Sequence, residues 1–242
     1  MIKLSKNTTL LFQGDSITDG GRGKSMDGNH ILGHGYSYII SAKLSLDNYE
    51  NMPKFINKGV SGESLLQIYS RLNMDILQNK PDIISFLAGV NDIAKSFGEP
   101  EGMASRRYIK VYKMMLEDIK KALPKSTIII CEPFFLEIDN YEEPYKNTPY
   151  VMCEEFVKPM NIPKNEEFIG VMQREIKIMQ KELKELAKDM GCIYVPLQEE
   201  FLKYAEKIPL EYLVWDNVHP TACGHEVIAR KWLEVVEKEL ES

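Results

Sequence analysis

The sequence has no long apolar run and no block of basic residues. No apolar stretch approaches the ~20 residues that a membrane-spanning helix requires. Lys and Arg number 30 against 36 Asp and Glu, which gives a formal net charge of −6. Proteins that bind the phosphate backbone of nucleic acids need the opposite balance of charge. We therefore expect neither a membrane nor a nucleic acid as a partner.

Cysteines are few, and none stands in a Cys-x-x-Cys pair. The four are Cys131, Cys153, Cys192 and Cys223. Because disulfide frameworks and metal sites show characteristic spacings, we interpret these residues as buried thiols in a reducing compartment. The histidines and carboxylates show no metal-ligand pattern either, so we expect no metal and no cofactor. The first residues lack a signal-peptide pattern, and the expected location is the cytoplasm.

Short apolar runs alternate with helical patterns along the 242 residues. The predicted strands are residues 8–13, 54–58, 82–88, 126–132 and 192–197. The predicted helices are residues 64–79, 105–123, 166–190 and 222–240. Runs that are apolar at successive residues are typical of strands covered on both faces. The alternation predicts one domain over residues 1–242 with a three-layer α/β/α architecture and a five-stranded parallel sheet.

Polar residues follow the predicted strands at the points where each strand ends. Asp15 and Ser16 follow the first strand, GVSGES with Gly62 follows the second, and GVND with Asn91 follows the third. The segment WDNVHP comes after the fifth strand and a short helical segment. Ligands of open parallel sheets bind beyond the carboxyl ends of the strands. We therefore expect these residues to gather at one edge of the sheet.

These residue types are the ones that serine-catalysed ester hydrolysis uses. Ser16 is the candidate nucleophile, and His219 is the candidate base because Asp216 stands three residues before it and can orient it. The backbone N–H groups of Ser16 and Gly62 and the side-chain amide of Asn91 are candidate donors to an oxyanion. Each short motif also has a structural reading. A helix cap, a tight turn or a stabilised loop would explain each motif when taken alone.

The blocks GDSIT, GVSGES, GVND and DNVHP occur in that order. Together they resemble the four sequence blocks of the SGNH hydrolases, also called GDSL esterases. The resemblance implies a flavodoxin-like SGNH hydrolase fold, a triad of Ser16, Asp216 and His219, and an oxyanion hole of Ser16, Gly62 and Asn91. The G-x-S-x-G elbow of the α/β-hydrolases is absent.

The resemblance extends over almost the whole chain and is greatest to a bacterial branch that includes acetylxylan and other carbohydrate esterases. It implies a serine esterase that removes short acyl groups, such as acetyl, from xylo-oligosaccharides or related carbohydrates through an acyl-enzyme. It also implies self-association as a homo-oligomer. Two other readings stay open: a lysophospholipase or thioesterase with the same triad, and a non-catalytic carbohydrate-binding module.

Substrate contacts are expected from residues beside the catalytic motifs and from one irregular segment. Asp15, Tyr36 and Trp215 are the candidate substrate-binding residues. Residues 133–165 hold five of the 12 prolines and a group of aromatic residues: Phe134, Phe135, Tyr141, Tyr145, Tyr150 and Phe156. Such a segment could stack on sugar rings or close over an acyl group. A subunit contact or a structural excursion explains it equally well.

Overall fold

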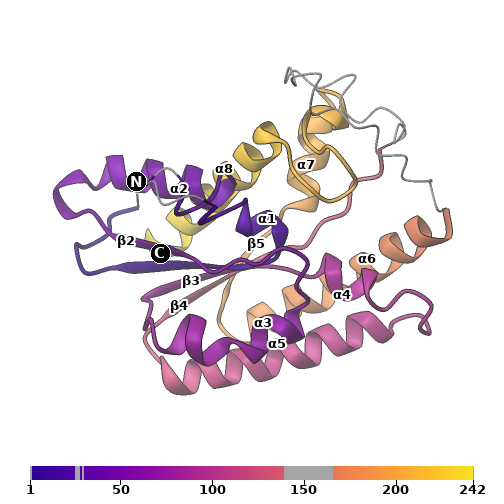
Figure 1. Cartoon of the computed structure of the whole chain (residues 1–242), viewed down its shortest axis with the longest axis horizontal. Coiled ribbons are helices and arrows are strands. Elements are labelled where there is room, and N and C mark those ends of the chain that lie inside the picture. Colours follow the sequence, from indigo (N-terminus) through magenta and orange to yellow (C-terminus); the bar gives the residue numbers. More distant parts are fainter. Residues whose placement is uncertain (1, 25–27, 29, 139–165, 242) are drawn as a thin grey trace.

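The computed structural model describes residues 2–24, 28, 30–138 and 166–241, and these form a central sheet between two layers of helices (Figure 1). The strands are β1 (Thr9–Gly14), β2 (Lys54–Asn57), β3 (Ile83–Leu87), β4 (Thr127–Cys131) and β5 (Ile193–Val195). All neighbouring strands are parallel, in the order β2-β1-β3-β4-β5. This order is that of flavodoxin-like sheets, and it confirms the predicted three-layer α/β/α fold.

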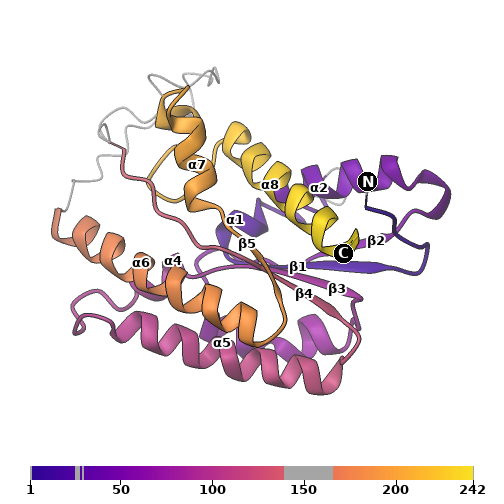
Figure 2. The same ribbon diagram turned by 180° about the vertical axis from the view of Figure 1, so that it is seen from behind.

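The helices divide between the two faces of the sheet (Figures 1 and 2). One face is covered by α3 (Leu65–Ser70), α4 (Val90–Ala94), α5 (Met103–Ala122) and α6 (Glu166–Asp189). The other is covered by α2 (Tyr36–Asp47), α7 (Gln198–Ala205) and α8 (Ala222–Glu241), while the short helix α1 (Ser16–Asp19) follows β1 directly. No helix among the described residues is both long enough and apolar enough to cross a membrane.

The strands are apolar at successive positions because each face of the sheet has its own core. In β1, Leu11 contacts the core under α3 and α5, whereas Leu10 and Phe12 contact the core under α2 and α8. Successive side chains of a strand point to opposite faces, so a strand covered on both sides needs apolar residues throughout. One buried hydrogen bond lies within the core under α2 and α8. It joins α8 to β3, since Trp232 Nε1 donates to Ser85 Oγ at 3.0 Å.

Two of the differences from the prediction have a clear physical reason. The predicted helix 64–79 is broken, because α3 ends at Ser70 and a π-helical turn spans Asn73–Leu77. Helix α2 was not predicted, since Ser37 and Ser41 occupy its buried face and interrupt the apolar stripe. A helix whose buried face carries serine does not show the periodic apolar pattern that sequence reading depends on.

The segment 133–165 is described only as far as residue 138. Phe134 and Phe135 are buried, and the ring of Phe134 packs against Phe201 with a centroid distance of 4.5 Å. Of the two readings left open for this segment, the structural one holds for these two aromatics, because Phe134 and Phe135 belong to the two cores. The other aromatics of the segment, Tyr141, Tyr145, Tyr150 and Phe156, lie outside the described residues.

Candidate active site

The loops that follow β1, β2 and β3 are hydrogen-bonded to one another at the carboxyl edge of the sheet. Val60 N–H donates to Gly14 O at 3.0 Å, and Asp15 N–H donates to Leu87 O at 3.4 Å. Farther along the second loop, Leu65 N–H donates to both carboxylate oxygens of Asp92, at 3.2 and 3.0 Å. The sheet thus brings the GDSIT, GVSGES and GVND motifs together, as the strand-end rule predicts.

The second loop lies directly against helix α1. A Cβ atom on Gly59 would come within 2.5 Å of Asp19 N, so only glycine allows this approach. Asp19 Oδ2 accepts from Ser61 N–H at 2.9 Å, and Arg22 Nε donates to Gly59 O at 2.6 Å. These contacts fix the loop that carries Gly62 beside the helix that carries Ser16.

The WDNVHP segment forms a small closed loop. Val214 and Pro220 pair as an antiparallel bridge, and Trp215 N–H donates to His219 O at 3.1 Å. Inside this loop, Asp216 Oδ1 accepts from Val218 N–H at 2.8 Å and from His219 N–H at 2.6 Å. The aspartate therefore orders the loop with one oxygen and leaves the other for a side chain.

Ser16, His219 and Asp216 form one chain of hydrogen bonds. Ser16 Oγ lies 2.8 Å from His219 Nε2, and His219 Nδ1 lies 2.6 Å from Asp216 Oδ2. Ser16 and His219 are 203 residues apart in the sequence. The arrangement can pass the proton of Ser16 to an imidazole that the aspartate orients.

The pKa of His219 is raised above its ordinary value of 6.5. Partial burial of the ring lowers the pKa, but the hydrogen bond to Asp216 and the charges of Asp216 and Asp15 together raise it by more. Nearby negative charge stabilises the imidazolium form. The same charges would stabilise the imidazolium that forms when His219 accepts a proton from Ser16.

The three candidate oxyanion donors lie on three of the connected loops. Ser16 is the first residue of α1, where a backbone N–H has no acceptor within the helix. Gly62 is exposed and has a φ of +80°, a backbone conformation that favours glycine. Asn91 Nδ2 donates to Glu63 O at 3.1 Å, which joins Asn91 to the residue that follows Gly62.

Asp15 does not face solvent, so the expectation that it contacts a substrate is corrected. Its side chain is 1% exposed, and Oδ1 caps α1 by accepting from Ile17 N–H at 3.0 Å. Oδ2 is buried, and no described residue hydrogen-bonds to it. Burial raises the pKa of Asp15 to about 7, opposed by the Ile17 hydrogen bond and by His219. Burial likewise raises the pKa of Asp92 to about 6.

Tyr36 is also a core residue, and its predicted role in substrate binding is wrong. Its side chain is fully buried, and its hydroxyl pairs with Thr18 Oγ1 at 2.9 Å. Its backbone N–H donates to His225 Nδ1 at 3.1 Å, and burial lowers the pKa of that histidine to about 3. A neutral His225 therefore accepts this bond and joins α2 to α8.

Trp215 is the one candidate substrate-binding residue that is partly exposed. Its ring stacks on His219, with a centroid distance of 5.0 Å and an angle of 18° between the planes.

Among the described residues, no group of three or more His, Cys, Asp or Glu side chains could hold a metal ion. Cys131 is a buried thiol, whereas Cys192 and Cys223 are only partly buried, and Cys153 lies outside the described residues.

The model of the GDSL-like lipase/acylhydrolase family matches residues 10–232. The chain belongs to this family. It is therefore a serine-type acyl-ester hydrolase, a GDSL protein with the SGNH hydrolase fold.

Similar proteins cover nearly the whole of this GDSL chain. It is 27% identical over 240 residues to an acetylxylan esterase of Geobacillus stearothermophilus, a match that covers 97% of this chain and 96% of the relative. A crystal structure of that esterase has a TM-score of 0.73 at 26% identity and 96% coverage of both chains. A GDSL-like lipase from Parabacteroides merdae has a TM-score of 0.75 at 28% identity and 97% coverage of both.

Proposed function

We propose that this GDSL hydrolase removes acetyl groups from xylo-oligosaccharides or related carbohydrates, with Ser16 as nucleophile. The observation that carries the serine mechanism is the hydrogen-bonded chain of Ser16, His219 and Asp216, with its distances of 2.8 and 2.6 Å. The first distance is within the range over which a base takes a proton from a nucleophile, and the second is that of a hydrogen bond which orients the base.

The proposed reaction has two halves. Ser16 Oγ attacks the carbonyl carbon of the ester while His219 Nε2 takes the hydroxyl proton, and Asp216 stabilises the resulting imidazolium. Collapse of the tetrahedral intermediate transfers that proton to the leaving sugar oxygen and leaves an acetyl group on Ser16. Water then attacks the acetyl-enzyme with His219 again as base, the bond between Ser16 Oγ and the acetyl carbon breaks, and His219 returns the proton to Ser16 as acetate leaves. The proposal requires no metal or cofactor.

We assign the negative charge of the tetrahedral intermediate to three donors. They are the N–H of Ser16, the N–H of Gly62 and the Nδ2 group of Asn91. A preorganised donor of this kind contributes about 3 kcal/mol to stabilisation of the transition state. Asn91 donates without carrying a charge, so it binds the oxyanion without holding the acetate product as an ion pair.

Two facts about relatives support the roles and the substrate. Crystal structures of the acetylxylan esterase include catalytic mutants in which a serine, an aspartate or a histidine is replaced by alanine. The aspartate and histidine of those mutants are three residues apart, the spacing of Asp216 and His219. The exposed part of the Trp215 ring offers an apolar surface of the kind that packs against a sugar, and we keep Trp215 as a substrate-binding residue.

Acetate release from acetylated xylo-oligosaccharides tests this function. Wild type and Ser16→Ala are compared on these sugars and on 4-nitrophenyl esters of increasing chain length. We expect short-chain preference and a loss of at least about 1,000-fold in Ser16→Ala. Preference for long acyl chains would favour the lysophospholipase or thioesterase alternative. An inert wild type would favour the carbohydrate-binding module, and activity that survives Ser16→Ala would overturn the mechanism.

Three further expectations stay predictions: cytoplasmic location, self-association and the lack of a nucleic-acid partner. The first two concern the setting of the enzyme rather than its chemistry. Sedimentation of the purified chain would test the homo-oligomer directly.

A further inference from the structure

Two of the proposed oxyanion donors depend on the position of one residue, Glu63. Glu63 follows Gly62 in the chain, so its backbone sets the direction of the turn that presents the Gly62 N–H. Its N–H donates to Val60 O at 3.3 Å and closes that turn. Its carbonyl oxygen accepts from Asn91 Nδ2 at 3.1 Å and so orients the amide of Asn91. A shift of Glu63 would move both donors together.

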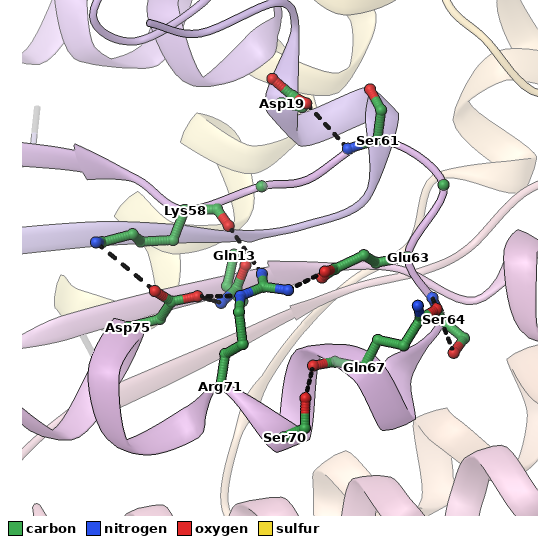
Figure 3. A network of polar contacts seen from close by, with 12 residues as sticks. Gln13, Asp19, Lys58, Ser61, Glu63, Ser64, Gln67, Ser70, Arg71 and Asp75 are labelled. Atoms are coloured by element: carbon green, nitrogen blue, oxygen red, sulfur yellow. Dashed lines mark hydrogen bonds and ion pairs between the residues drawn. The ribbon is translucent and has the colours of Figure 1, made fainter.

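The side chain of Glu63 points toward Arg71, which holds it by an ion pair (Figure 3). One carboxylate oxygen pairs with Arg71 Nη1. The other is buried and has no hydrogen-bond partner among the described residues. A carboxylate taken out of water in this way is stable only beside a cation. Arg71 supplies that cation, and its own pKa is raised chiefly by the hydrogen bond to Glu63.

Arg71 is in turn fixed by other parts of the fold. Its Nε donates to Asp75 Oδ2 at 2.8 Å, and its Nη2 donates to Lys58 O at 3.5 Å (Figure 3). Asp75 also pairs with Lys58 Nζ at 3.6 Å and accepts from Gln13 Nε2 at 3.3 Å. Arg71 stands at the end of α3, and the π-helical turn after it brings Asp75 back to the guanidinium.

We propose that Glu63 and Arg71 form a positioning pair that fixes the Gly62 and Asn91 donors of the oxyanion hole. The proposal rests on the function proposed above, because it concerns the same intermediate. Neither side chain is a catalytic residue in this assignment, since both act through the backbone of Glu63. Donors stabilise an oxyanion only when they are held in place beforehand, and a displacement of about 1 Å can lower the rate by about 100-fold.

Arg71→Met tests the pair, because methionine keeps much of the side-chain length and removes the guanidinium. We expect kcat on 4-nitrophenyl acetate to fall by about 10- to 100-fold, with KM within about twofold of wild type, since the ground-state ester makes no oxyanion contact. Arg71→Lys should recover part of the rate because it restores the charge. Arg230→Met is the matched control. Arg230 also makes an i,i+4 pair through Nε, to Glu226, but lies on α8.

A double-mutant cycle separates positioning from general loss of stability. If Arg71 acts through the oxyanion hole, the loss in kcat from Arg71→Met combined with Asn91→Ala will be smaller than the product of the two single losses. A folded Arg71→Met protein with unchanged kcat would overturn the proposal, and so would losses that multiply in full. If Arg71→Met does not fold, Glu63→Gln and Arg71→Lys take its place in the cycle. A wild type without Ser16-dependent hydrolysis would remove both proposals, whereas Ser16-dependent hydrolysis insensitive to Arg71 would remove only this one.

Discussion

The loop that carries Asp216 and His219 is closed by a backbone bridge between its own ends, whereas the loop that carries Gly62 is held by side chains from other elements. The first is held by the Val214–Pro220 bridge and by two backbone N–H groups on Asp216, and its buried Asn217 accepts from Leu136 N–H at 2.9 Å and from Ile138 N–H at 3.3 Å. The second is held by side chains of α1, of α4 and of the end of α3. Lys95 adds a further contact, since its Nζ donates to Gly62 O at 2.6 Å.

This difference has a physical basis in what each loop presents. The acid–base loop presents two side chains, and the hydrogen bonds that Asp216 Oδ1 accepts within the turn help to set their directions. The oxyanion loop presents the backbone N–H of Gly62, and glycine has no side chain that could anchor this group. Its direction is therefore set by contacts to its neighbours, among them the partly buried Glu63–Arg71 pair. Changes in the first loop should act on proton transfer, and changes in the second on charge stabilisation.

Asp216→Asn should give the largest effect and should change the pH dependence as well as the rate. The amide cannot accept the Nδ1 proton as a carboxylate does, so we expect kcat to fall by about 10³- to 10⁴-fold. Asp216 is a main cause of the raised pKa of His219. The acidic limb of kcat/KM, which reports loss of a proton from His219, should lie above pH 6.5 in the wild type and move to lower pH in the variant.

A pH–rate profile of both proteins on 4-nitrophenyl acetate checks this prediction. Arg71→Met, which acts on the oxyanion loop, serves as the control. The acidic limb of its pH–rate profile should stay where it is in the wild type. A limb that does not move in Asp216→Asn would contradict the role of Asp216 as the partner of His219.

The parts of the fold that were predicted from sequence are those with a continuous apolar signal. The run at 82–88 became β3 (Ile83–Leu87), and the pattern at 166–190 became α6 (Glu166–Asp189). The meeting of Ser16 and His219 was also predictable, because parallel strands end at a common edge. The spacing of Asp216 and His219 within one loop then identified the acid–base pair.

The remaining features depend on packing that no local pattern encodes. Asp15 and Tyr36 were expected to face a substrate because they are polar and lie near the motifs, yet both are buried. Glu63 and Arg71 lie on either side of the short helix α3 and are eight residues apart, whereas a regular helix predicts partners three or four residues apart. The sequence signal for this pair was the presence of charged residues beside a glycine turn, and this signal is not specific.

Asp15→Asn tests the buried carboxylate next to Ser16 through the stability of the fold rather than through the rate of hydrolysis. The folded-state pKa of about 7 lies above the ordinary value of 3.8. Between these values the folded state holds a proton that the unfolded chain releases. Ionisation of Asp15 therefore does not lower the free energy of unfolding below pH 3.8. Between pH 3.8 and 7 it lowers this free energy increasingly as the pH rises. Asparagine keeps the oxygen that accepts from Ile17 N–H at the start of α1, and it removes the charge.

We expect Asp15→Asn to raise the free energy of unfolding by about 2 kcal/mol at pH 8, and by less than half of that at pH 5. Urea unfolding at the two pH values measures this difference. Asp82→Asn is the control, because the exposed Asp82 also accepts a backbone N–H, from Thr9 at 2.8 Å. A gain that is equal at both pH values would contradict ionisation as the cause.

Trp215→Leu should give the smallest effect, and it acts on the loop that carries Asp216 and His219. The indole lies flat against His219, so it limits the orientation of the imidazole and stabilises its charged form. A stacked pair of this kind contributes about 1 kcal/mol, and we expect kcat to fall by about three- to tenfold. Trp215→Phe, which keeps an aromatic face, should lose less. Steady-state kinetics on both 4-nitrophenyl acetate and acetylated xylo-oligosaccharides separates the two roles of the ring. A loss confined to the sugar indicates substrate contact alone, whereas an equal loss on both esters indicates that the ring acts on His219.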